Sequence, residues 1–82
     1  MQITVRLIGR YKEIIGKKNI NLTINAGDTI WNVVDDLVEK YPSIEKDRKF
    51  IMVLKNNIYT TLDSKVSDGD EITLSPPVVS GG

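Results

Sequence analysis

The segment TIWNVVDDLVEKYP, residues 29–42, decides which fold the sequence can adopt. Its apolar side chains recur at intervals of three and four residues, which places them along one side of a helix. Asp28 or Thr29 can cap the start of this helix, and Pro42 ends it. One helix with a single apolar stripe can cover one face of one sheet, so we predict that pairing of layers. The stripe consists of Ile30, Val33, Val34, Leu37, Val38 and Tyr41.

Two strands are predicted on the N-terminal side of this helix. Apolar and polar residues alternate over residues 2–7 and again over residues 20–24, as half-buried strands require. Between them, residues 10–15 are long enough for about one and a half helical turns, and Gly16 stops that helix. Two strands joined in this way can pair antiparallel.

The segment after the main helix is predicted to hold a loop and a buried strand. Residues 43–49 carry charges of both signs, so we expect an irregular, solvated loop. Residues 50–54 form an apolar run short enough for a strand that is buried on both faces. This pattern suggests that the run is the central strand of the sheet.

The last third of the chain is predicted to contain two further strands. Asn56 and Asn57 tolerate the positive φ of a tight turn, which leads into a short edge strand. A second turn at residues 68–70 precedes a final strand at residues 71–75. We predict an α+β, β-grasp (ubiquitin-like) roll with a mixed sheet of four to five strands at residues 1–75 and a flexible, extended tail at residues 76–82. If the last strand lies parallel to the first, the tail leaves from the middle of the sheet.

Composition limits the possible functions. The 82 residues make one small domain, and 11 basic and 11 acidic residues cancel, so the chain offers no field for nucleic acid or an anionic membrane. Cysteine and histidine are absent, which removes disulfides, the usual zinc ligands and the side chain best suited to proton transfer at neutral pH. We therefore expect a cytoplasmic protein without a bound metal or cofactor.

The C-terminal stretch SDGDEITLSPPVVSGG, residues 67–82, resembles the end of the MoaD family of ubiquitin-like sulfur carriers. That family typically has DGDE, a strand, PPV and a terminal Gly-Gly. This sequence departs from the pattern at Val79 and Ser80, since the family usually places a single small residue before the two glycines. It departs also at Ser75, where relatives often carry a large apolar residue. The length, the strand at residues 1–7 and the helix after AGDT also fit this family, which is one of the MoaD/ThiS ubiquitin-like sulfur carriers.

The resemblance implies the small subunit of molybdopterin synthase, a sulfur donor that is not an enzyme by itself. A MoeB-like, E1-like activating enzyme would spend ATP to adenylate the carboxylate of Gly82, and a sulfur donor would then convert it to a thiocarboxylate. A MoaE-like large subunit would use that sulfur on a pterin precursor, in molybdenum or tungsten cofactor biosynthesis.

The candidate site residues follow from this interpretation. Gly81 and Gly82 lack a Cβ, so the backbone can pass a narrow channel to a buried site. The prolines fix φ and favour an extended course, and an apolar residue on the polar strand face near the tail root could belong to a patch for partners. The partner-binding candidates are Pro76, Pro77, Val78, Val79, Ile8 and Tyr59.

Two alternatives stay open. The chain could be a ubiquitin-like modifier that is conjugated to other proteins through Gly82, or the sulfur carrier for thiazole formation in the thiamin pathway. The thiamin carrier is disfavoured, because such chains resemble this one less at PPV and are usually shorter. A plain binding module is the remaining interpretation.

Overall fold

The structure is a computed structural model, and it describes residues 1–77. Five strands and three helical segments follow one another along the chain. In order they are β1 (Gln2–Leu7), α1 (Arg10–Ile15), β2 (Asn19–Thr23), α2 (Ile30–Lys40), the 3-10 helix η1 (Pro42–Asp47), β3 (Met52–Lys55), β4 (Ile58–Thr60) and β5 (Glu71–Ser75).

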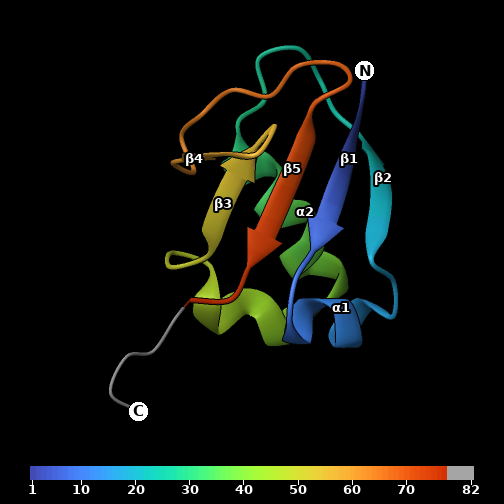
Figure 1. Ribbon diagram of the computed structural model, residues 1–82, viewed down its shortest axis with the longest axis vertical. Coiled ribbons are helices and arrows are strands. Elements are labelled where there is room, and N and C mark those ends of the chain that lie inside the picture. Colours follow the sequence, from blue (N-terminus) through green and yellow to red (C-terminus); the bar gives the residue numbers. More distant parts are fainter. Residues whose placement is uncertain (78–82) are drawn as a thin grey trace.

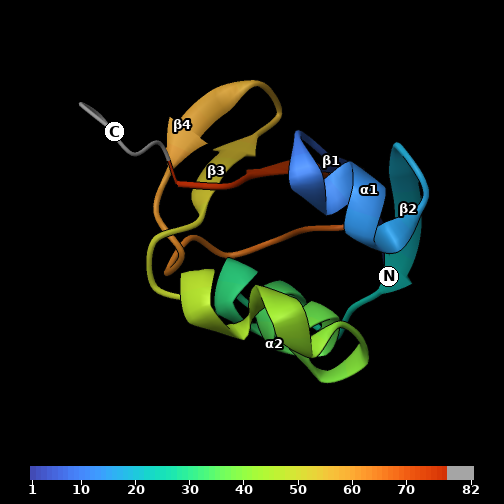
Figure 2. The same ribbon diagram turned by 90° about the horizontal axis from the view of Figure 1, so that it is seen from below.

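The five strands form one mixed sheet in the order β2-β1-β5-β3-β4 (Figure 1). β1 and β5 pair parallel at the centre, whereas β1–β2, β3–β4 and β3–β5 pair antiparallel. Figure 2 shows α2 on one side of the sheet, while the opposite face of β5 and β3 carries no helix. This arrangement confirms the predicted β-grasp roll, and it shows that the last strand lies parallel to the first, which the sequence left open.

The core lies between the sheet and α2. In the central pair, Val5 stands opposite Ile72 and Leu7 opposite Leu74, and all four side chains are buried. Burying apolar side chains of this size is the main source of stability in a domain this small. From α2 the buried members are Ile30, Val33, Val34 and Leu37, while Val38 and Tyr41 are partly buried against them.

The ends of α2 and the turns follow their local chemistry. Thr29, rather than Asp28, caps α2: its N–H donates a 2.8 Å hydrogen bond to Oδ1 of Asn32. Gly16 ends α1 at φ 80°. Asn56 and Asn57 join β3 to β4 at φ 52° and 70°, which confirms the predicted tight turn and its edge strand.

The prediction that residues 50–54 form the central strand is wrong. β3 begins at Met52 and lies second from the edge, and the side chain of Phe50 is 67% exposed. The N–H of Phe50 donates to the carbonyl of Asp47 at 2.7 Å, which continues the preceding helical turn instead of a strand. The central position belongs to β5, because parallel pairing with β1 inserts it between the two hairpins.

The prediction of an irregular, solvated loop at residues 43–49 is also wrong. Pro42 begins the 3-10 helix, and Ile44 and Asp47 are buried. Ile44 belongs to the core cluster, and Asp47 meets polar partners from α1. Those buried contacts order a segment whose charges alone suggested exposure.

Neither α1, α2 nor η1, the helical segments among residues 1–77, has the length and apolar character needed to cross a bilayer. β5 ends at Ser75, next to the predicted start of the tail. The division of the chain at residue 76 stays a prediction.

Candidate functional site

The predicted start of the tail lies directly after the central strand. The N–H of Ile8 donates to the carbonyl of Leu74 at 3.1 Å, so the β1–β5 pairing continues to the last turn before the prolines. Gly9 follows at φ 61°, and a Cβ on it would lie 3.6 Å from both Cδ and Cγ of Pro76. Pro76 thus lies beside the Gly9 backbone, at the end of the β1–β5 pair.

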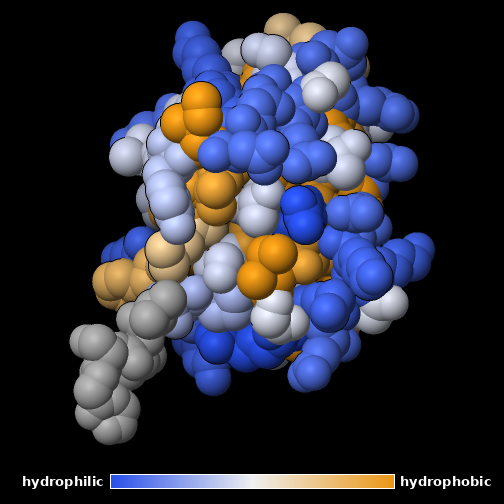
Figure 3. Space-filling view, in the orientation of Figure 1, coloured by the Kyte–Doolittle hydropathy of each residue, from blue (hydrophilic) through white to orange (hydrophobic). Residues whose placement is uncertain are grey.

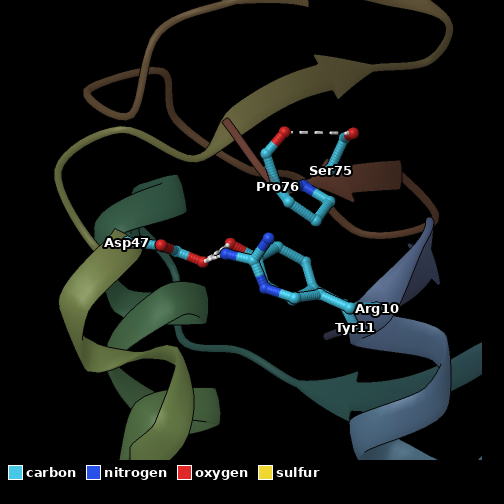
Figure 4. Close-up of polar contacts among 5 residues, drawn as sticks. All are labelled: Arg10, Tyr11, Asp47, Ser75 and Pro76. Atoms are coloured by element: carbon cyan, nitrogen blue, oxygen red, sulfur yellow. Dashed lines mark hydrogen bonds and ion pairs between the residues drawn. The ribbon is translucent and has the colours of Figure 1, made fainter. Parts of the chain in front are cut away.

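A partly buried polar cluster lies near the end of β5. Figure 4 shows Arg10 and Tyr11 of α1 pointing toward Asp47 of the 3-10 helix, with Ser75 and Pro76 nearby. The Tyr11 hydroxyl donates a 2.8 Å hydrogen bond to Oδ2 of Asp47, and the Arg10 guanidinium pairs with the same oxygen. The cluster therefore connects α1, which follows the end of β1, to the segment after α2.

Tyr11 is a structural donor and does not act as an acid in this site. Burial raises the pKa of its hydroxyl well above the usual range, and the hydrogen bond and negative charge of Asp47 raise that pKa further. The Arg10 cation acts in the opposite direction. The hydroxyl stays protonated at neutral pH and keeps donating to Asp47.

The open face of the sheet is hollowed beside the tail root. A shallow depression of about 410 Å³ has Ile8, Met52, Leu54 and Tyr59 in its lining, with polar atoms from Arg6, Thr73 and Ser75. Apolar side chains gather on this face near the tail in Figure 3. An apolar centre with a polar rim is the usual make-up of a protein-binding surface.

The structure brings together two of the predicted site residues from distant strands. Ile8 lies at the end of β1 and Tyr59 in β4, yet both line the open-face depression, and Tyr59 is 70% exposed. Pro76 and Pro77 directly follow Ser75, which lines the depression, and both are partly buried. Val78, Val79, Gly81 and Gly82 lie outside the described residues, so the roles predicted for them stay predictions.

Several residues of the site were missed by sequence reasoning. Met52 and Leu54 were assigned to a buried strand, and Asp47 to a solvated loop. Gly9 carried a usable signal, since a glycine between a strand and a helix often marks a positive φ. No local sequence signal marks Arg10 and Tyr11 as site residues, because their partner Asp47 lies 36 residues after Tyr11.

The acidic turn at residues 68–70 has internal hydrogen-bond partners. Asp68 accepts from the N–H of Gln2 at 2.8 Å, and Asp70 accepts from the N–H of Ser67 and from Nδ2 of Asn56. Within residues 1–77 no group of three or more acidic side chains converges as a metal site would require. These carboxylates hold the turn that leads into β5.

Known proteins resemble this chain over nearly its whole length. The sequence profile of the ThiS family matches residues 5–82. The chain is 35% identical over 82 residues to the molybdopterin synthase sulfur carrier subunit of Arabidopsis thaliana, covering 100% of this chain and 84% of that protein. It is 32% identical over 84 residues to the protein of the same name from Dictyostelium discoideum, covering 99% and 96%. It is 30% identical over 86 residues to small archaeal modifier protein 1 of Haloferax volcanii, covering 94% and 97%.

Solved structures show the same fold. The crystal structure of SAMP1 from Haloferax volcanii superposes with a TM-score of 0.80 at 28% identity, with 100% of both chains covered. A chain in the complex of subunits 1 and 2 of the molybdopterin-converting factor from Helicobacter pylori superposes with a TM-score of 0.64 at 22% identity, covering 99% and 100%.

A mixed five-stranded sheet with one covering helix defines a ubiquitin-like domain of the β-grasp class. The chain belongs to the ThiS family.

Proposed function

We propose that this chain is the sulfur-carrying small subunit of a molybdopterin synthase. The observation that carries the proposal is the 35% identity over all 82 residues to a sulfur carrier subunit of that enzyme. The fold supports it, because the central strand β5 ends at Ser75, immediately before the two prolines. The reactive group is then the carboxylate of Gly82.

The chemistry needs activation, because a carboxylate with a pKa of roughly 3.5 is an anion at neutral pH and a poor electrophile. An activating enzyme joins one carboxylate oxygen to the α-phosphorus of ATP and releases pyrophosphate. The sulfur of a hydrosulfide or persulfide donor then attacks the carbonyl carbon, and AMP leaves with that oxygen. Hydrosulfide gives the thiocarboxylate directly; with a persulfide donor, a thiol reduces the resulting acyl disulfide, is itself oxidised to a disulfide, and releases the thiocarboxylate. Transfer of the sulfur to the pterin precursor returns the carboxylate, with water supplying the oxygen.

The partners in this proposal meet the open face. A MoaE-like large subunit and a MoeB-like activating enzyme both need access to the tail, so each would dock where Ile8 and Tyr59 line the depression beside its root. The chain itself supplies no acid or base for the reaction and binds no cofactor. ATP is spent by the activating enzyme, and the whole process takes place in the cytoplasm.

The tail residues then have distinct roles. Pro76 and Pro77 restrict φ, so the tail loses less entropy when it enters a partner. Val78 and Val79 contact apolar walls of the channel. Gly81 and Gly82 let the backbone reach a buried site, because a Cβ would need room that a narrow channel lacks.

A second candidate function is protein modification through Gly82. The 30% identity to small archaeal modifier protein 1 over nearly the full length of both chains favours it. Both functions begin with the same adenylate and differ in whether a sulfur or an amine accepts the glycyl group. Service as the thiamin-pathway sulfur carrier is the third candidate.

The deciding experiment is intact-mass analysis of the chain after incubation with ATP, an activating enzyme and a sulfur donor. We expect a mass gain equal to replacement of one oxygen by sulfur, localised to Gly82. The chain that lacks Gly82 is the control and should gain nothing. Adding a MoaE-like subunit and the pterin precursor should then return the original mass and yield molybdopterin. Loading without that second step, together with covalent adducts on lysines of other proteins, would refute the synthase role.

A further inference from the structure

A second groove lies away from the tail, along the free edge of the sheet. β2 is the outermost strand on its side, and Figure 1 shows no element beyond it. The groove, of about 350 Å³, runs between β2 and the C-terminal end of α2. It shares no lining residue with the open-face depression.

The backbone of β2 offers hydrogen bonds at this edge. The N–H of Leu7 donates to the carbonyl of Lys18 and the N–H of Ile24 to the carbonyl of Met1, both at 2.8 Å. Since hydrogen-bonded pairs alternate along an antiparallel ladder, the intervening residues of β2 direct their backbone groups outward. Those residues are Asn19, Asn21 and Thr23, and none of their N–H or C=O groups has a backbone partner elsewhere in residues 1–77.

The groove next to this edge has an apolar floor. Ile20 and Leu22 stand opposite Val5 and Ile3 in the sheet, so their side chains face α2. Both remain partly exposed, because no strand covers their outer side. Together with Leu37 and Tyr41 they line the groove that an added strand would border.

The charge of the groove is positive. Lys17 and Lys40 line it, and no acidic side chain does. The ion pairs found among residues 1–77 are Arg10 with Asp47 and Arg48 with Asp35, so neither lysine is neutralised by an ion pair there. An occupant with acidic side chains would complement both.

The strand also lacks the usual protection of a free edge. Proteins blunt exposed edges with proline, charged residues, bulges or very short strands. β2 has five residues, NINLT, without proline or charge, whereas the opposite edge strand β4 has three.

We propose that the groove between β2 and α2 binds an extended, acidic peptide segment of a partner protein, which adds to the sheet as a strand beside β2. Its backbone pairs with Asn19, Asn21 and Thr23, and alternate apolar side chains enter the groove. Acidic residues flanking them contact Lys17 and Lys40. Because the open face stays free, this partner binds a carrier whose tail is engaged elsewhere.

The test uses the full chain and a blocked, fluorescent synthetic peptide with two alternate valines flanked on each side by an acidic residue. Fluorescence anisotropy measures affinity, and amide chemical shifts of the labelled chain locate the site. We expect saturable binding with the largest shifts in residues 19–23 and near Lys40. A peptide with lysines in place of the acidic residues should bind more weakly.

Two variants separate backbone pairing from charge. Asn21→Pro removes an outward N–H without breaking the β1–β2 ladder, and should weaken binding about tenfold. Lys17→Glu should weaken it about two- to fivefold at low salt. Lys46→Glu makes the same charge change on the exposed side of the 3-10 helix, outside the groove, and should leave affinity unchanged.

The charge variant keeps the test valid if Asn21→Pro fails to fold, which thermal unfolding would reveal. The proposal would be overturned by a lack of saturable binding, by chemical-shift changes confined to the open face, or by an affinity that Lys17→Glu does not change. Self-association of the chain through β2, seen as concentration-dependent broadening without peptide, would also overturn it, because a second copy would then occupy the edge.

Discussion

The hydroxyl of Tyr11 donates a 2.8 Å hydrogen bond to the carboxylate of Asp47, 36 residues further along the chain. The bond is buried, and Arg10 pairs with the same carboxylate. It joins the short helix after β1 to the 3-10 helix after α2, below the point where the tail leaves the sheet. The polar cluster is therefore expected to stabilise the fold without taking part in the sulfur chemistry.

Asp47→Ala should lower the free energy of unfolding by about 2 kcal/mol, because the buried Tyr11 hydroxyl loses its acceptor. Arg10 adds little, since its side chain is 45% exposed. Urea unfolding followed by the fluorescence of Trp31, the one tryptophan in the sequence, measures the loss. Glu45→Ala, on the same helix but exposed, should change stability by less than about 0.5 kcal/mol. Equal losses for both variants would contradict the assigned role of Asp47.

Stability should fall at alkaline pH in a way that depends on Tyr11. Its pKa in the folded state lies above the ordinary value of 10.0, so the folded chain holds this proton more tightly than the unfolded chain does. The resulting stability is complete below pH 10 and is lost as pH rises toward the folded pKa. Comparing urea midpoints at pH 8 and about pH 11 for wild type and Tyr11→Phe measures the effect. Tyr11→Phe should have a lower urea midpoint than wild type at pH 8, and its midpoint should fall less between the two pH values. Equal falls in the two proteins would contradict the role assigned to Tyr11.

Gly9→Ala should destabilise the chain more than Gly16→Ala. Gly9 has φ 61° and ψ −136°, close to a region that side chains with a Cβ rarely enter, and strain there costs about 2–3 kcal/mol. Gly16 has φ 80° and ψ 12°, a left-handed conformation that costs about 1–2 kcal/mol. A Cβ at Gly16 would meet nothing within 4 Å, whereas at Gly9 it would contact Pro76. Thermal unfolding of both variants tests the order, and a smaller loss at Gly9 would contradict it.

Ile8→Asp should weaken binding of a MoaE-like large subunit about tenfold, because it places a charge in the apolar centre of the open-face depression. Folding should be nearly unaffected, since Ile8 is 38% exposed. Ile58→Asp provides the matched control: Ile58 lies in β4 beside Tyr59, is 71% exposed and does not line the depression. Isothermal titration with the large subunit measures both. Equal weakening by the two variants would place the interface elsewhere.

Gly81→Val should abolish sulfur loading and leave the free energy of unfolding within about 0.5 kcal/mol of wild type. The added side chain would block entry into a narrow channel of the activating enzyme. Ser80→Ala, the adjacent small-to-small change, should load normally. Intact-mass analysis reads out loading, and normal loading of Gly81→Val would disprove the channel argument.

Much of the fold was predictable because its signals are local. The alternation of β1, the apolar stripe of α2 and the asparagine turn after β3 each depend on neighbouring residues, and the structure confirms them. The prediction of a central strand at residues 50–54 failed, because apolar composition alone does not distinguish a central strand from a segment that joins the sheet only at Met52. Which strand is central depends on pairing between the two ends of the described chain.

The site was predictable in part. The exposed position of Ile8 follows from strand alternation, and the structure confirms it. Its proximity to Tyr59 depends on the order of the strands in the sheet, which alternation does not give. The burial of Asp47 could not be predicted, since a charged residue among others of mixed sign is usually solvated. Its partners on α1 become neighbours through tertiary packing, as does the contact between Gly9 and Pro76.

The central position of the last strand also links folding to readiness for activation. β1–β2 and β3–β4 can each form as a local hairpin, but the sheet is joined when residues 71–75 insert between them, a contact of very high sequence separation. Pro76 reaches its place against Gly9 in that same step. Under the proposed function, an activating enzyme that recognises this arrangement would adenylate folded chains and leave unfolded ones untouched.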